Sequence, residues 1–149
     1  MGWSNNPKDF IKQIENDLCD YQKKIVADAL QGVIEASPVD SGAFKGNHRV
    51  SINSIDTGFN ENIQDKTGSE TLAKGLNILA QLVPFSVVYI QNNAPYGKVL
   101  EYGGYPDPVK NGSWVKGKGF VIKSVKGFSK QAPLGIYGVT FTLIKEKYK

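Results

Sequence analysis

Cysteine and histidine are nearly absent from this 149-residue chain, which has one of each, Cys19 and His48. A single cysteine excludes a disulfide within the chain and with it the small disulfide-stapled class of secreted domain. One cysteine and one histidine without ligand spacing form no zinc motif, so we expect no metal site. Cys19 lies in a helical pattern with no basic neighbour, which favours a structural thiol over a nucleophile.

Long apolar runs are also absent. The longest, over residues 78–85, is interrupted by Gln81 and Pro84 and is far shorter than the ~20 residues that cross a bilayer. The first residues, MGWSNN, lack the basic and apolar stretches of a signal peptide. We therefore expect no export signal and no membrane partner.

The composition, 40% hydrophobic and 21% charged, is ordinary for a globular protein and excludes disorder throughout the chain. The length fits a single domain over residues 1–149. A compact monomer of this mass has an accessible surface of roughly 7,500 Å².

Charge is distributed unevenly behind the net value of +4. Residues 1–107 sum to −4, with 9 basic and 13 acidic side chains, whereas residues 108–149 sum to +8, with nine lysines and one glutamate. No arginine lies in the second segment. Lysine is a hydrated point charge that suits phosphates or acidic surfaces without sequence readout. The alternative is an ordinary solvated face.

The first half of the chain predicts two helices and a strand. Asn6-Pro7 marks a helix start, and a helical apolar pattern continues to Ala36, which predicts a helix over about 7–36. A helix this long spans its domain or packs against a neighbour. Its apolar face consists of Ile11, Ile14, Leu18, Tyr21, Ile25 and Ala29. Alternation over 48–54 predicts a strand, 56–68 a mobile loop, and the capping-box pattern over 67–70 a helix that ends at Pro84.

The second half predicts strands over 85–91, 120–125 and 135–145, although Pro133 could instead start a helix. A short helix over 96–102 ends at Gly103, the glycine-rich residues 103–119 form no regular element, and a lysine-rich insertion loop covers about 104–127. The fold class is therefore α+β: a long N-terminal helix plus a shorter helix, packed on a mostly antiparallel sheet of about four strands.

Catalytic patterns are weak. Asp40, Ser41 and His48 could be imagined as a triad, but the first two are neighbours in a turn and no nucleophile elbow surrounds the serine. A half-exposed strand histidine is the better interpretation. Residues 112–119 are glycine-rich but lack the Walker spacing for phosphate. We expect no enzyme activity and no cofactor. Trp114 either anchors a partner or packs its loop onto the domain.

Three ordered motifs carry a resemblance. They are SPVDSG with GNHRVSI at 37–52, VYIQNNAPY with LE and Gly103 at 88–103, and FSKQAP with Gly135 at 128–135. Together they resemble the neck or tail-completion family of long-tailed bacteriophages, whose pattern includes P-V-D-T-G, Y-I-x-N-N-x-P-Y-A-x-x-L-E-x-G and S-x-Q-A-P-x-G. Ser41, His48 and Gly97 depart from that pattern, and residues 104–127 are inserted relative to it.

The resemblance implies a virion structural protein of the neck, a minor tail protein made in the host cytoplasm that joins the head connector to the tail tube. It implies a ring of identical subunits, with a hexamer favoured, next to a head-completion or connector protein and a tail terminator or tail tube protein, with DNA passing through the channel. We expect its partner interface to include Asn92, Asn93, Pro95, Tyr96, Glu101, Tyr102, Trp114, Gln131 and Pro133.

Two other functions stay open. One is a non-specific nucleic-acid-binding module that uses the lysine-rich C-terminal third, and the other is a small enzyme built on Asp40, Ser41 and His48. The candidate contacts to DNA or an acidic partner are Lys116, Lys118, Lys123, Lys126 and Lys130.

Overall fold

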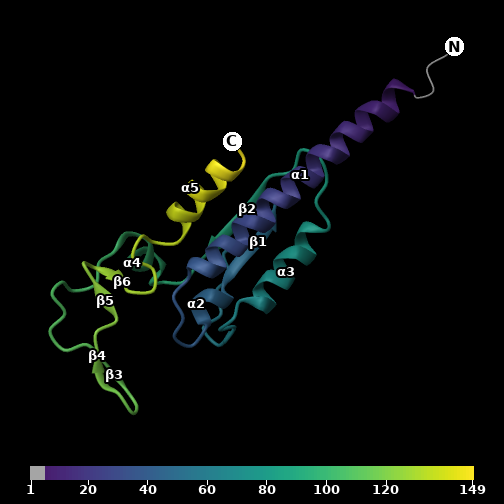
Figure 1. The fold of residues 1–149 in the computed structure, drawn as a ribbon. Helices are drawn as coiled ribbons and strands as arrows, with labels where there is room; N and C mark the ends of the chain where they lie inside the picture. The colour runs from purple at the N-terminus through teal and green to yellow at the C-terminus, as the bar shows by residue number, and fades with distance from the viewer. Residues whose placement is uncertain (1–5) are drawn as a thin grey trace.

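The long N-terminal helix is confirmed. The computed structural model describes residues 6–149, and its first element, α1, runs from Pro7 to Ala36. The Asn6 side chain accepts a hydrogen bond from the Lys8 amide at 3.0 Å, and Ser37 ends the helix in extended conformation. At 1.5 Å per residue, α1 is about 45 Å long. In Figure 1 its N-terminal half projects beyond the rest of the molecule.

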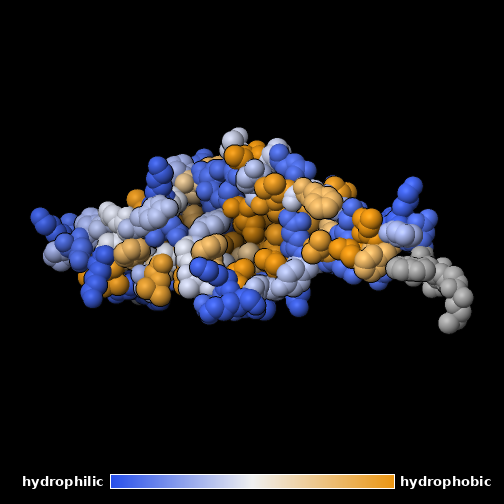
Figure 2. Space-filling view, turned by 90° about the horizontal axis from the view of Figure 1, so that it is seen from above, coloured by the Kyte–Doolittle hydropathy of each residue, from blue (hydrophilic) through white to orange (hydrophobic). Residues whose placement is uncertain are grey.

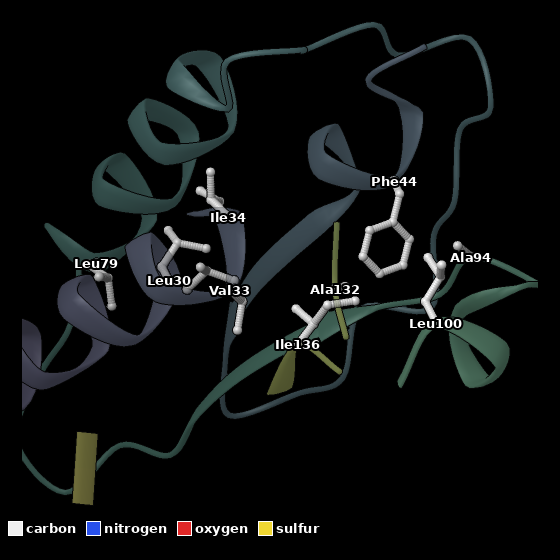
Figure 3. Close-up of a cluster of buried hydrophobic side chains, with 10 residues drawn as sticks. Leu30, Val33, Ile34, Phe44, Leu79, Ala94, Leu100, Ala132 and Ile136 are labelled. Atoms are coloured by element: carbon white, nitrogen blue, oxygen red, sulfur yellow. The ribbon is translucent and has the colours of Figure 1, made fainter. Parts of the chain in front are cut away.

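The C-terminal half of α1 forms the core. Figure 3 shows Leu30, Val33 and Ile34 of α1 in the same cluster as Leu79 of α3 (Ser69–Leu79) and Phe44 of α2 (Ala43–Gly46). The cluster also takes in Val50, Ala94, Leu100, Ala132 and Ile136. Helix α4 (Gly97–Tyr102) lies at its far end, and α5 (Tyr137–Lys147) packs along α1 (Figure 1).

The strands pair antiparallel, which confirms the α+β class, but they form three two-stranded sheets rather than one sheet of about four strands. β1 (His48–Ile52) pairs with β2 (Val88–Asn92), with Val50 opposite Ile90. β3 (Ser113–Val115) pairs with β4 (Gly119–Val121), and β5 (Ser124–Val125) with β6 (Phe128–Ser129). The predicted insertion 104–127 therefore contains β3, β4 and β5, and the single strand predicted over 120–125 is wrong, because these residues are divided between two local hairpins.

The strand predicted over 135–145 is wrong, because these residues form α5. On a helix, the alternating apolar residues do not share one face, and Phe141 and Leu143 are 68% and 64% exposed. Thr140 instead faces α1, where a Cβ on Gly32 would lie 2.7 Å from its methyl carbon. The Glu101 carboxylate, from a distant part of the chain, caps the start of this helix. The residues near position 137 therefore carry no sequence signal for a helix start.

The capping box predicted over 67–70 is also not formed. Gly68 occupies the N-cap of α3 at φ +80° without a side-chain cap, and the helix ends at Leu79 rather than Val83. Asp65 takes over the capping role: its carboxylate accepts hydrogen bonds from the amides of Gly68 (2.9 Å) and Thr71 (2.8 Å) and from the Thr71 hydroxyl (2.7 Å). Burial raises the pKa of Asp65, but these bonds outweigh burial and hold it below its usual value.

The surface is large for the chain's mass. The accessible area is 10,292 Å², roughly a third more than a compact monomer of this size presents. Figure 2 shows a hydrophobic band across one face that continues toward the N-terminal end. Among residues 6–149, no helix is both long and apolar enough to cross a membrane.

Candidate interface

The three motifs of the sequence meet at one place in the fold. His48 of the first motif is paired with Asn92 of the second across β1 and β2. The Gln131 side chain of the third motif accepts from the Val39 amide at 2.9 Å and donates to the Val39 carbonyl at 3.1 Å. The motifs therefore build one contiguous region around α4.

Glu101 links the second motif to the start of α5, which directly follows the third motif. Its carboxylate accepts hydrogen bonds from the amides of Ile136, Tyr137 and Gly138, each at 2.8 Å. These are orphan donors at the start of α5, where the helix dipole also favours an anion. Glu101 is therefore the N-terminal cap of α5, and both of its oxygens are used within the chain.

Asn92 and Asn93 are similarly occupied. Asn92 donates to the Phe44 carbonyl at 2.7 Å and accepts from the Ala94 amide at 3.1 Å. Asn93 donates to the carbonyls of Asp56 and Gly58, both at 2.8 Å. These amides shape the turn that leads into α4, and their contact with a partner stays a prediction, as it does for Glu101 and Gln131.

A groove of about 850 Å³ lies between α4 and α5. Phe44, Ala94, Pro95, Tyr102, Tyr137 and Phe141 supply most of its apolar lining, and Lys98 is its one lysine. Tyr102 is 78% exposed, and Phe141 is also largely exposed, so the groove opens to solvent. We call it the α4–α5 groove.

Tyr96 and Pro133 lie next to this region. Tyr96 is partly exposed and packs its ring 6.0 Å from that of Phe44. Burial, followed by nearby Tyr105 and Asp40, raises the pKa of Tyr96. Pro133 is exposed and forms a bridge with Gly135 just before α5.

Trp114 does not pack its loop onto the domain. It lies on β3 opposite Phe120 of β4, the two rings meet edge to face at 5.2 Å, and both residues are 69% exposed. The β3–β4 hairpin projects from the end of the molecule opposite the N-terminus (Figure 1). Residues 112–119 are thus the greater part of a hairpin and not a phosphate cradle.

All five candidate lysines of the C-terminal third are exposed. Lys116 and Lys118 lie at the turn of the β3–β4 hairpin, and Lys126 lies between β5 and β6 with φ +51°. Lys123 pairs weakly with Asp40 at 3.7 Å on the surface, and Lys130 follows β6. Lys123 lines a cavity together with Asp40 and Gln131, but the other four lysines do not line it, so the five lysines do not converge on one site.

His48 is buried rather than half-exposed, and the structure gives it partners other than Asp40 and Ser41. Its Nε2 lies 2.6 Å from the Ser37 hydroxyl, which donates to the Val33 carbonyl at 2.5 Å, and its Nδ1 lies 2.8 Å from the Tyr137 hydroxyl. Because the Ser37 hydroxyl uses its proton in the bond to Val33, His48 Nε2 carries the proton that it donates to Ser37, and Nδ1 accepts a hydrogen bond from the Tyr137 hydroxyl. Burial lowers the pKa of His48 to about 3 and raises that of Tyr137. This closed network leaves no activated nucleophile at Ser41.

Cys19 is buried and lies 3.3 Å from the Leu82 carbonyl, as expected of a structural thiol. Within residues 6–149, no group of three His, Cys, Asp or Glu side chains is arranged to hold a metal ion.

The apolar face predicted for α1 is not the face that the structure buries. The buried residues of the helix, Cys19, Leu30, Val33 and Ile34, lie on other faces, and Leu30 is rotated by about 180° from Tyr21. α5 covers the predicted face only as far as Tyr21, whose ring meets that of Tyr148 at 5.7 Å. The exposed part of this face, together with Phe10 beside it and the half-covered Tyr21 at its edge, is called the α1 stripe: Phe10, Ile11, Ile14, Leu18 and Tyr21 have exposures between 43% and 62%.

Comparison with known proteins gave no significant match to a protein-family model, a curated protein or a solved structure.

Proposed function

We propose that the chain is a structural subunit of a bacteriophage neck, of the tail-completion type, that joins the head connector to the tail tube as a member of a ring. The observation that carries the proposal is the ordered set of three motifs. The fold joins the first to the second through His48–Asn92 and the first to the third through Gln131–Val39, and Glu101 of the second binds Ile136 directly after the third. The large surface and the exposed apolar residues support it, because they are typical of a chain that completes its burial in an assembly.

Virus particles produced by the strain that carries this gene provide the test. We expect the protein in purified virions, at the neck by antibody labelling, and we expect deletion of the gene to yield filled heads and free tails that do not join. Complete, infectious particles from the deletion strain would refute the proposal. An immunolabelled band at the tail tip would place the chain elsewhere in the virion and would refute it equally.

A second candidate, non-specific nucleic-acid binding, is favoured by the exposed lysines at the hairpin end. No acidic residue lies between Pro108 and Lys145, so this segment has no internal counter-charge. Each phosphate contact contributes a slope of about −0.9 in log K against log salt. We expect Lys116→Ala, Lys118→Ala and Lys126→Ala together to weaken duplex binding and flatten this slope, while Lys8→Ala, Lys12→Ala and Lys24→Ala do not. Equal effects of the two triple variants would argue against the hairpin end as a DNA contact.

A further inference from the structure

The α1 stripe is an interrupted helix–helix contact. α5 and Tyr148 pack on this face of α1 from Gly32 to Tyr21, and over the next three turns, from Tyr21 to Phe10, the large side chains of the face stay 43–62% exposed among residues 6–149. At roughly 180 Å² for each fully exposed large side chain, the five residues leave about 500 Å² of surface in one patch. That patch is at the upper end of what a monomer normally exposes, so a partner surface is expected to cover it.

The α4–α5 groove is suited to apolar side chains rather than to a polar ligand. Its lining includes three polar side chains from the motifs, and all three are satisfied within the chain: Asn92, Asn93 and Glu101. A polar small molecule needs convergent unpaired groups, and these residues offer none. An amphipathic helix that binds through its exposed apolar side chains requires only a groove of sufficient apolar area and matching shape.

The charges beside the two surfaces are complementary. At 100° per residue, Glu15 and Asp17 flank the α1 stripe, one on each side, whereas Asp9 and Asp20 lie toward the opposite face of the helix. The groove lining contains Lys98 and also Glu101, whose carboxylate is bonded to three amides at the start of α5, and Lys145 follows Phe141 by one helical turn on α5. Two α1 helices would set like charges against each other, whereas α1 on the groove sets acidic against basic side chains.

We propose that the α1 stripe of one copy of this chain occupies the α4–α5 groove of a second copy. Within one chain the contact is excluded, because α1 is a continuous helix whose N-terminal half points away from α4 (Figure 1). The two surfaces differ, so the contact is head-to-tail and each subunit keeps one surface free for the next, as a ring requires. The stripe offers about 500 Å², and the exposed Tyr102 and Phe141 of the groove add roughly 260 Å² at the same ~180 Å² per side chain, so each contact is small and is made twice by every subunit of a closed ring. The inference rests on the oligomeric part of the proposed function.

Two double variants of the full chain, measured by light scattering after size exclusion, test the contact. Ile14→Lys with Leu18→Lys removes the stripe, and Tyr102→Lys with Phe141→Lys removes the groove. We expect the unmodified chain to form multiples of 16.3 kDa and each variant to be a 16.3 kDa monomer. Mixing the two variants is expected to yield a 1:1 dimer, because each retains the surface that the other has lost.

The control is Ile55→Lys, which adds a lysine at a 62% exposed isoleucine outside both surfaces and is expected to assemble normally. Far-UV circular dichroism verifies folding, and Leu18→Ser replaces the stripe variant if lysines unfold it. An unmodified chain that is monomeric, a stripe variant that still assembles, or a mixture that stays monomeric would each overturn the contact. None of these results decides the neck location, which depends on the particles of the deletion strain.

Discussion

Replacing Glu101 with alanine removes the cap of α5, and the cost can be worked out from its three bonds. The carboxylate accepts the amides of Ile136, Tyr137 and Gly138, each at 2.8 Å. Loss of an N-terminal cap costs about 1 kcal/mol and up to about 2, and a hydrogen bond to a charged group contributes about 1.5–3. Water reaches the exposed Gly138 amide but not the buried one of Ile136. We therefore expect Glu101→Ala to lower the free energy of unfolding by about 2–4 kcal/mol.

The assay is urea unfolding followed by circular dichroism, at one protein concentration because association adds to apparent stability. The melting temperature should fall by roughly 5–12 °C, at 2–4 °C per kcal/mol for a chain of this size. Glu101→Gln keeps one acceptor oxygen without the charge and should lose about half as much. Glu61→Ala is the control, since Glu61 is an exposed loop residue, and it should change stability by less than about 0.5 kcal/mol. A loss from Glu101→Ala no larger than this control would refute the capping role.

Two further changes test the core. His48 takes up a proton below about pH 6.5 in the unfolded chain but only near pH 3 in the folded one, so stability should fall by about 1.4 kcal/mol per pH unit, or about 2 kcal/mol from pH 7 to pH 5. His48→Gln should remove that slope in urea unfolding at the two pH values, and equal slopes would contradict it. Gly75→Ala should cost about 1–3 kcal/mol despite better helix propensity, because its Cβ would lie 2.3 Å from a Leu30 methyl carbon. As a control, Asn77→Ala changes an exposed residue of the same helix and should leave stability unchanged in the same measurement. A Gly75→Ala variant more stable than the unmodified chain would contradict the prediction, because it would show that Leu30 moves aside at little cost.

The helices and strands whose boundaries are set by their own residues could be predicted from the sequence. Asn6 and Pro7 set the start of α1, and Gly103 at φ +80° ends α4. β1 and β2 were also predicted, because β-branched residues alternate or cluster there and turns bound them. In each case the residues that decide the structure lie within a few positions of the element itself.

The sequence-based predictions were wrong where residues far apart in the chain determine the local structure. Residues 137–147 alternate like a strand, but Glu101, 35 positions before Ile136, caps them as a helix. Similarly, Asp65 caps α3 from outside the capping box at 67–70. The single sheet of four strands failed for the same reason: two of its expected strands lie in a helix and in local hairpins. His48 was expected to be half-exposed, since a strand pattern does not show that Ser37 and Tyr137 would enclose it.

Polar and apolar residues of the candidate interface have different roles. The motif residues with polar side chains, Asn92, Asn93, Glu101 and Gln131, spend their hydrogen bonds inside the chain, so they act first on the shape of the region around α4. Among the large side chains that face water, Leu18 and Phe141 lie outside the motifs, whereas Tyr102 lies within the second motif at a position that the family pattern leaves open. A shared motif can therefore preserve a scaffold while the contacts that choose a partner vary. On this argument, partner choice depends on the α1 stripe and the β3–β4 hairpin, and exchanging those segments should change what the protein binds without changing its fold.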